Sequence, residues 1–358
     1  MLYIVIIAGG KGERFWPKSV KAMPKQFHRI VTERTMIQET FHRIYPEVDR
    51  SRIFVAAGAH LRDIILEQLP ELDERNLIVE PVGKNTAPAI GLSAAVIGNL
   101  DAEAVIAVLS ADHVVETKEG FLAALQDAER AAERGYIVTF GIEPTRPATE
   151  FGYIEVGNAL SGDFKHEVYA VRRFREKPSL KRAREYIEAG TFFWNSGMFI
   201  FRVTALLDAM AEHMPSLYSG LMRIQESLDT GREERVKREE FDGFESVSID
   251  YGIMEKSDRI ACLKPRFVWD DVGSWSALER HRKGDENGNM HEGNIITVDS
   301  ADSIVFGDSD SIIALVGMRN VIVVKEGKRI LVCRKGSDQK VKEALKRIAE
   351  NEANVKYL

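Results

Sequence analysis

The sequence predicts an α/β protein with a doubly wound, mixed and mostly parallel sheet, followed by a small domain of short strands. Three observations support this prediction. Strand patterns alternate with helix patterns along the first part of the chain, which is typical of doubly wound sheets. A glycine-rich loop follows the first strand, at the sheet edge where ligands bind in such folds. After residue 286, five short strand patterns follow at roughly regular spacing.

The first part of the chain contains five strand patterns and four helix patterns. The strands are short apolar runs, and the helices repeat apolar residues with helical spacing, as Met36, Phe41 and Ile44 do. We expect strands over Leu2–Ile7, 52–57, 76–79, 104–109 and 136–142. We expect helices over 35–45, 60–69, 89–100 and 121–134.

The second part is interrupted by Pro144, Pro147 and Gly152 and then becomes richer in sheet patterns. Strands are expected over 151–156, 168–174, 259–263 and 266–269, with an aromatic run over 192–199 and a short helix opening at 248–251. A charged helical stretch is expected over 203–240. The C-terminal strands are expected over 295–298, 303–306, 312–316, 321–324 and 330–333, before a final helix.

The composition is that of a globular chain without a broad basic field. Its 358 residues are 44% hydrophobic and 29% charged, enough for a large core and a smaller second domain. A net charge of -6 argues against nucleic-acid or membrane partners. Two cysteines within apolar runs, no apolar run of membrane-spanning length and no basic leader predict a cytoplasmic protein.

The loop of residues 8–27 is the first candidate site. It reads AGGKGERFWP, then six residues, then PKQF. Its small residues would let a ligand approach the main-chain amides: Ala8, Gly9, Gly10 and Gly12. Between positions 11 and 25 five cations stand against one acid, which favours a polyphosphate: Lys11, Arg14, Lys18, Lys21 and Lys25.

This loop does not match the two most familiar phosphate motifs. A dinucleotide fingerprint would need glycine at Phe15, and Pro17 and Pro24 interrupt the helix that should follow. A P-loop would need lysine and then Ser or Thr after Gly12, where Glu13 and Arg14 stand. A surface turn with solvated lysines is the alternative interpretation.

Polar residues follow two further strands at the same predicted edge. Glu80 could accept from the N1–H and 2-amino groups of guanine, although an ordinary strand exit is the alternative. Asn85 and Thr86 follow and could equally begin the next helix. Asp112 follows the most apolar strand, and its carboxylate suits Mg²⁺ or another divalent cation, although it could also be a turn residue.

The later part of the chain contains two motifs suited to a sugar phosphate. A cation-rich stretch includes Arg175-Glu176-Lys177-Pro178, where Pro178 allows a bend that separates the two charged side chains. Asn195 is an amide within an aromatic run and near a glycine, which suits bonding to a hydroxyl. Asp250 is a plausible helix cap.

The loop and the motifs that follow it resemble the sugar-1-phosphate nucleotidylyltransferases. The spellings Phe-Trp-Pro and Pro-Lys-Gln-Phe, with EP..KNTAPA and FREKP, are similar to the mannose-1-phosphate guanylyltransferase branch. The resemblance implies a Rossmann-like nucleotidyltransferase fold, with Glu80, Asn85 and Thr86 at the nucleotide. It also implies that Glu176 binds sugar hydroxyls, with Gly152 and Asn195 in the same site, and that Lys177 binds phosphate. Asp271 aligns with a second metal ligand beside Asp112.

The same resemblance implies a small left-handed β-helix that mediates dimers at the C-terminus, with a flat sandwich as the alternative. We therefore expect a nucleotidyltransferase domain over 1–285, with a nucleotide half over 1–143 and a sugar-phosphate half over 144–285. The β-helix and its final helix would occupy 286–358. No room is expected for the isomerase domain that longer relatives carry.

The reaction that the resemblance implies joins GTP and mannose 1-phosphate by in-line attack on the α-phosphorus, giving GDP-mannose and pyrophosphate. Arg14 would hold the leaving phosphates and Lys25 would neutralise the α-phosphoryl charge. Transfer to another hexose or a heptose 1-phosphate stays open. A non-catalytic nucleotide-sugar-binding subunit is the second alternative, and a dinucleotide-dependent oxidoreductase is weakened by Phe15 and the prolines.

Overall fold

The computed structural model describes residues 1–358, which form two compact units. The first unit contains residues 1–9 and 40–270, and the second contains residues 10–39 and 271–358. The glycine-rich loop thus belongs, after Gly9, to the same unit as the C-terminal residues. The domain division predicted at residues 285 and 286, and that at 143 and 144, stay predictions.

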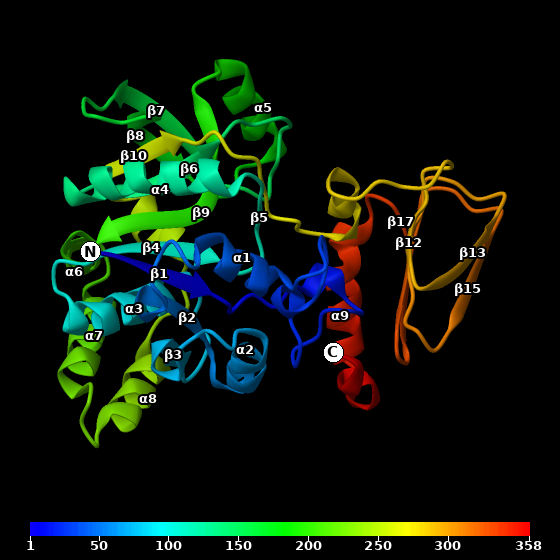
Figure 1. Ribbon diagram of the computed structural model, residues 1–358, viewed down its shortest axis with the longest axis horizontal. Helices are drawn as coiled ribbons and strands as arrows, with labels where there is room; N and C mark the ends of the chain where they lie inside the picture. The colour runs from blue at the N-terminus through cyan, green and yellow to red at the C-terminus, as the bar shows by residue number, and fades with distance from the viewer. The chain divides into compact units, whose positions relative to one another are not determined.

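A nine-stranded mixed sheet forms the centre of the first unit (Figure 1). Its strands are β1 (Leu2–Ile7), β2 (Ile53–Gly58), β3 (Leu77–Glu80), β4 (Val105–Ser110), β6 (Ile137–Ile142), β7 (Tyr153–Ala159), β8 (Glu167–Arg175), β9 (Phe192–Arg202) and β10 (Ile260–Lys264). They lie in the order β3-β2-β1-β4-β9-β6-β10-β8-β7. The first four are parallel, whereas β9 runs antiparallel to β4 and β6. The predicted mixed sheet is confirmed.

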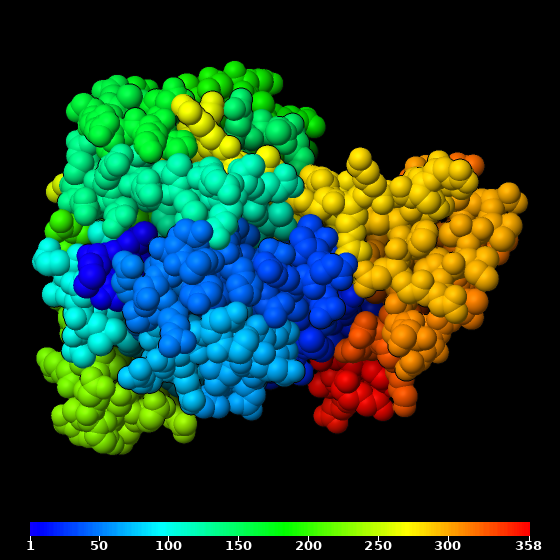
Figure 2. Space-filling model, in the orientation of Figure 1, coloured from blue at the N-terminus to red at the C-terminus, as the bar shows by residue number.

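Helices cover both faces of this sheet. They are α1 (Met36–Ile44), α2 (Arg62–Gln68), α3 (Thr86–Leu100), α4 (Lys118–Glu133), α5 (Leu180–Ala189), α6 (Val203–His213), α7 (Pro215–Ser227) and α8 (Glu233–Gly243). Tyr3 and Val5 of β1 share a core cluster with Ile90 of α3, while Phe121 of α4 packs on Phe140 of β6. In Figure 2 the segments carrying α1, α2 and α4 form much of the visible surface in the blue-to-teal range. The doubly wound arrangement therefore buries the strand residues that point to either face of the sheet.

The helical stretch expected over residues 203–240 consists of three helices. The first break lies at Met214, because Pro215 cannot continue a helix but is well suited to begin one. The second lies between Ser227 and Glu233. None of the helices combines the length and the apolar character that a membrane span requires.

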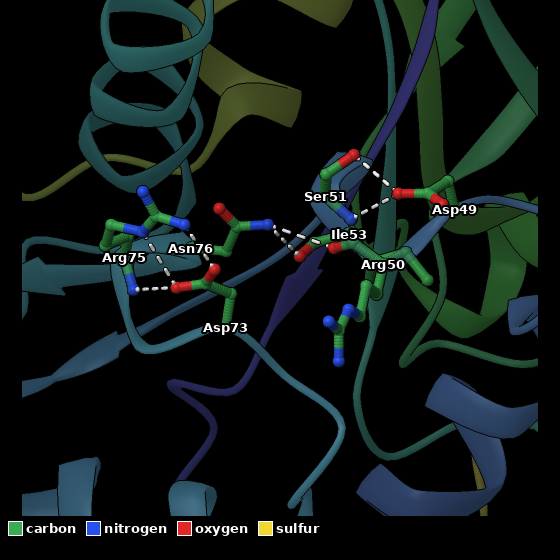
Figure 3. Close-up of polar contacts among 7 residues, drawn as sticks. All are labelled: Asp49, Arg50, Ser51, Ile53, Asp73, Arg75 and Asn76. Atoms are coloured by element: carbon green, nitrogen blue, oxygen red, sulfur yellow. Dashed lines mark hydrogen bonds and ion pairs between the residues drawn. The ribbon is translucent and has the colours of Figure 1, made fainter.

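Polar side chains fix the starts of β2 and β3 (Figure 3). The buried amide of Asn76 donates to the carbonyl oxygens of Arg50 and Ile53, at 3.0 and 3.1 Å. Asp49 and Asp73 accept from backbone amides two residues further on. These bonds set the register in which Gly58 pairs with Glu80, so the other end of β3 carries the predicted base-reading carboxylate.

The C-terminal strands wind as a β-helix. They are β12 (Met290–Glu292), β13 (Asn294–Val298), β14 (Ile304–Phe306), β15 (Ile312–Val316), β16 (Val321–Glu326) and β17 (Arg329–Arg334). The parallel pairs β12–β14, β14–β16 and β13–β15 require the chain to return to the same side after each coil. A flat sandwich is therefore wrong. β17 adds an antiparallel edge to β16, and α9 (Val341–Ala349) follows.

Candidate active site

The carboxyl ends of β1 and β3 bring Gly9 and Glu80 together. Glu80 is 5% exposed, and its carboxylate makes no hydrogen bond or ion pair within the protein. A Cβ added to Gly9 would lie 3.9 Å from Glu80 Oε1, so the glycine leaves open space beside this oxygen. Burial raises the pKa of Glu80 from 4.5 to about 7. A ligand that supplies N–H groups could satisfy a buried acceptor of this kind.

The two residues before α3 have different contacts. Asn85, with φ 72°, accepts a bond from the amide of Thr86 through its side chain, so it stabilises the start of the helix. The hydroxyl oxygen of Thr86 accepts from the amide of Ile249 at 2.9 Å. Asn85 is thus exposed at the helix start, while Thr86 is tied to the segment that continues into Asp250.

The glycine-rich loop begins at a sheet edge and turns sharply at Gly12. The amide of Ala8 is bonded to the carbonyl of Ala56, so it cannot serve a ligand without leaving the sheet. The amides of Gly9 and Gly10 make no hydrogen bond within the protein. Gly12 has φ 57°, and a Cβ there would overlap the Cβ of Lys25. The motif therefore needs glycine at position 12 for both backbone angle and space.

Lys25 lies buried in the second unit, against the segment that carries Asp271. The lysine is 3% exposed, and its Nζ donates to the backbone oxygen of Asp271 at 2.8 Å. The same Nζ lies 5.5 Å from the centroid of the Phe15 ring, which packs on Trp275. Val272, next to Asp271, has φ 40°, which is unusual for a β-branched residue. Lys25 is thus held by a hydrogen bond and packed beside an aromatic ring.

Arg14 and Trp16 connect the same loop to the C-terminal residues of the second unit. Arg14 donates to Gln339 Oε1 at 3.0 Å, and the Trp16 indole donates to the Tyr357 carbonyl at 2.8 Å. Lys18 forms an ion pair with Glu292 at 3.3 Å. The C-terminal domain therefore supports the conformation of the loop, a role that the sequence did not indicate.

Asp112 follows β4 in the first unit and is about one-third exposed at its side chain. The Trp269 indole donates to Nδ1 of His113 at 3.2 Å, which leaves the proton on Nε2, 3.9 Å from Asp112 Oδ1. His113 directly precedes β5 (Val114–Val115), which pairs with β11 (Trp269–Asp270) in a two-stranded ribbon that begins at Trp269. The chain leaves β11 one residue before Asp271.

The two predicted metal ligands supply the donor type that Mg²⁺ prefers. Asp112 and Asp271 each offer carboxylate oxygens, and phosphate oxygens usually complete such a site. No group of three or more His, Cys, Asp or Glu residues is arranged to hold a metal by itself. Asp112 lies in the first unit and Asp271 in the second.

The predicted sugar-phosphate residues Gly152, Glu176 and Asn195 gather in the first unit. A Cβ on Gly152 would overlap Oε2 of Glu176 and would lie 3.3 Å from Cβ of Asn195. Oε2 of Glu176 is buried and has no hydrogen-bond partner. Burial, with the nearby charge of Asp250, raises the pKa of Glu176 to about 7. These features describe an acceptor that a ligand hydroxyl could satisfy.

Lys177, two residues after the end of β8, has an unusual backbone conformation. Its φ is 52°, its side chain is 58% exposed, and its Nζ lies 3.3 Å from Glu176 Oε1. The chain therefore bends before Pro178, as the separation of a hydroxyl ligand from a phosphate ligand requires. The ammonium group is accessible to an anion.

Three further residues belong to this cluster but were not predicted. Asp250 accepts from the amide nitrogen of Asn195 at 2.9 Å, and Thr139 donates to the amide oxygen at 2.9 Å. Glu255 accepts from the backbone amide of Glu176 at 2.8 Å. The π-helical turn Asp250–Met254 has no side-chain cap, so the interpretation of Asp250 as a helix cap is wrong. Its distance from Asn195 in the sequence left no local signal of this contact.

The mixed sheet, the glycine-rich loop and the β-helix define a nucleotidyltransferase with an appended β-helical domain. Residues 3–288 match the family model described as nucleotidyl transferase. Residues 293–348 match the model described as MannoseP isomerase/GMP-like beta-helix domain.

Curated relatives place the chain more closely. It is 36% identical to mannose-1-phosphate guanylyltransferase of Klebsiella pneumoniae, over 98% of this chain and 75% of that protein. It is 35% identical to alginate biosynthesis protein AlgA of Pseudomonas putida, over 98% and 72% of the two chains. The chain belongs to the mannose-1-phosphate guanylyltransferase family of nucleotidyltransferases.

Two solved structures are similar to this chain. A crystal structure named mannose-1-phosphate geranyltransferase from Thermus thermophilus matches with a TM-score of 0.86 and 34% identity, over 97% of this chain and 99% of that chain. A structure named mannose-6-phosphate isomerase from Helicobacter pylori matches with a TM-score of 0.61 and 29% identity, over 75% of this chain and 99% of that chain.

Proposed function

We propose that this protein transfers the guanylyl group of GTP to mannose 1-phosphate, forming GDP-mannose and pyrophosphate. The observation that carries the proposal is the buried, unpartnered carboxylate of Glu80 beside Gly9, in a member of a family with this activity. A carboxylate can accept from both N1–H and the 2-amino group of guanine. Adenine and pyrimidine bases do not present this pair of donors, so Glu80 would select GTP.

The glycine-rich loop would hold the triphosphate. The amides of Gly9, Gly10 and Gly12, with Arg14, would bind the leaving phosphates, and this needs Arg14 to exchange its bond with Gln339. Lys25 would counter the charge that develops on the α-phosphoryl group. Its burial supports this role, because a preorganised charge in a water-poor site needs little rearrangement during the reaction.

The cluster around Gly152 would hold mannose 1-phosphate. Glu176 and Asn195 would bind sugar hydroxyls, and the exposed ammonium of Lys177 would bind the phosphate. Positioning the phosphate oxygen in line with the α-phosphorus is the main requirement, since no covalent intermediate is needed.

We also propose that Mg²⁺ or another divalent cation is required, with Asp112 and Asp271 as the protein ligands. Such an ion neutralises phosphate charge. Both residues offer carboxylate oxygens, and the contact of Lys25 with the Asp271 carbonyl supports a functional role for that segment.

We also propose that the protein is cytoplasmic, as its sequence favours. We propose further that it forms a homodimer through the C-terminal domain. The outward face of β13 and β15 is apolar apart from Asn294; its apolar residues are Ile296, Val298, Ile312, Ala314 and Val316. Ile312 and Val316 are 60% and 62% exposed, and the two-stranded sheet has unpaired edges. A second copy of the same face would bury these side chains.

The test of the activity is pyrophosphate release by the full chain with GTP, mannose 1-phosphate and Mg²⁺. We expect release only when both substrates are present. Equal turnover with another hexose or heptose 1-phosphate would favour that sugar instead. Tight binding of GDP-mannose with no pyrophosphate release would favour the non-catalytic regulatory subunit.

A further inference from the structure

The side-chain amide of Asn195 is held in a single orientation. Its oxygen accepts from Thr139 Oγ1 at 2.9 Å and from the Gly197 amide at 3.2 Å, while its nitrogen donates to Asp250 Oδ1 at 2.9 Å. The amide oxygen and nitrogen are similar in shape, but the partners distinguish them here. A backbone N–H can only donate and a carboxylate accepts, so the flipped amide would lose both contacts.

This orientation limits what Asn195 can do for a ligand. Both lone pairs of its oxygen have protein partners, and one of its two N–H groups is used by Asp250. One N–H remains, so Asn195 can donate to a ligand but cannot accept. Across Gly152 lies Glu176 Oε2, a buried acceptor without a partner. The pair offers one donor and one acceptor, which matches two hydroxyls of one sugar ring.

The acceptor that orients Asn195 comes from a segment with three separate attachments. The amide of Ile249 donates to Thr86 Oγ1, and Asp250 accepts from Asn195. Glu255, at the other end of the same turn, accepts from the Glu176 amide. Residues 249–255 therefore connect the helix start after the base-reading motif with both hydroxyl-binding side chains.

We propose that Asp250 is a positioning residue that fixes Asn195 as a hydrogen-bond donor to a hydroxyl of the sugar 1-phosphate. The inference rests on the proposed function, because it deepens the sugar site of that reaction. Asp250 would act through Asn195 and would not contact the reacting atoms. Its presence is costly for folding alone, because a buried carboxylate is expensive to desolvate and an apolar residue of similar size could fill the same space.

Two variants separate the contact from the charge. Asp250→Leu keeps much of the volume but removes the acceptor. Asp250→Asn keeps a carbonyl oxygen that can accept from Asn195, so it serves as the conservative rescue. We expect Asp250→Leu to raise the KM for mannose 1-phosphate about tenfold or more, since an oriented hydrogen bond is lost and its partner is released. The KM for GTP should stay within about twofold, and Asp250→Asn should recover most of the loss.

The Asn195→Ala background tests whether Asp250 acts through the amide. If it does, Asp250→Leu will add little to the rise in KM already caused by Asn195→Ala, because coupled residues are not additive. An equal further rise would overturn the proposal and would assign Asp250 a direct or general structural role. A parallel rise in the KM for GTP would overturn it as well.

A measurement without turnover keeps this inference separate from the proposed activity. In protein labelled with ¹⁵N at asparagine, the Asn195 side-chain signals can be assigned by their absence in Asn195→Ala. We expect one Asn195 amide proton to be shifted and protected from exchange, and this signature to disappear in Asp250→Leu but not in Asp250→Asn. Unchanged signals in Asp250→Leu would refute the positioning role. Failure of the wild-type protein to make a nucleotide sugar, with these signals as expected, would refute the proposed function alone.

Discussion

Glu80 provides a direct prediction, because the proposed recognition of guanine needs its ionised form while burial favours its neutral form. With a pKa of about 7, the carboxylate of the free protein is about one-tenth ionised at pH 6 and about nine-tenths ionised at pH 8. GTP affinity should therefore fall about tenfold from pH 8 to pH 6. At pH 7, binding should release about half a proton from Glu80, because the bound carboxylate is ionised.

The matched variant is Glu80→Gln, which keeps the shape but cannot ionise. The variant should bind GTP about ten- to a hundredfold more weakly at pH 8, since the Gln amide cannot accept from both guanine donors. Its affinity should lack the carboxylate's pH dependence. Titration of the GTP phosphates is common to both proteins, so it cancels in the comparison.

Isothermal titration calorimetry of GTP, in two buffers of different ionisation enthalpy and without sugar phosphate, measures both quantities. The omission of the sugar keeps Glu176 out of the measurement. Equal pH dependence and equal proton release in the wild type and Glu80→Gln would refute the assignment of Glu80 to the base.

Other predictions concern the fold and the remaining motifs. Glu80→Gln should raise the free energy of unfolding above pH 7 by at most about 3 kcal/mol. The folded-state pKa of Glu80 is raised, so the wild type loses stability as the pH rises from about 4.5 to about 7, and the variant, which cannot ionise, does not. Chemical denaturation at two pH values measures this difference. Gly12→Ala should destabilise the protein by more than about 1 kcal/mol, because position 12 has a positive φ and a Cβ there would overlap Lys25. The control Gly243→Ala, with open space at its Cβ, should not destabilise the protein. An equal loss of stability in both variants would contradict the steric argument. Gly152→Ala should displace Glu176 and raise the KM for the sugar phosphate about tenfold, with little change in the KM for GTP. If steady-state kinetics give the variant the same KM for the sugar phosphate as the wild type, this prediction is wrong. Lys25→Met should lower kcat about 10²- to 10³-fold, whereas the control Lys328→Met, at an exposed position outside the loop, should stay near the wild type. Near-normal turnover of Lys25→Met would exclude the charge role.

The parallel part of the sheet could be predicted from local patterns. Strands β1 to β4 are short, apolar and separated by helices, and their ends are marked by Gly9, Glu80 and Asp112. These residues could be found from the sequence because each stands at, or within two residues after, the end of a recognisable apolar run. The regular spacing of the C-terminal strands was compatible with a β-helix but left a flat sandwich open, and the parallel strand pairs decide between the two.

Other features depend on tertiary contacts that no local pattern encodes. Asp250 has the sequence context of a helix cap, yet its partner Asn195 lies on β9. The cation count of the loop indicated phosphate binding but gave no sign that Lys25 is buried against the Asp271 carbonyl. Nor did it indicate that Arg14 and Trp16 contact residues of the C-terminal segment. Such contacts join residues far apart in the chain.

The central claim is that an oxygen of mannose 1-phosphate attacks the α-phosphorus of GTP. Mannose 1-phosphate labelled with ¹⁸O in its phosphate group tests this directly, with the products analysed by mass spectrometry. The account predicts that all of the label is retained in GDP-mannose and that pyrophosphate carries none. Labelled pyrophosphate, or no GDP-mannose at all, would contradict it.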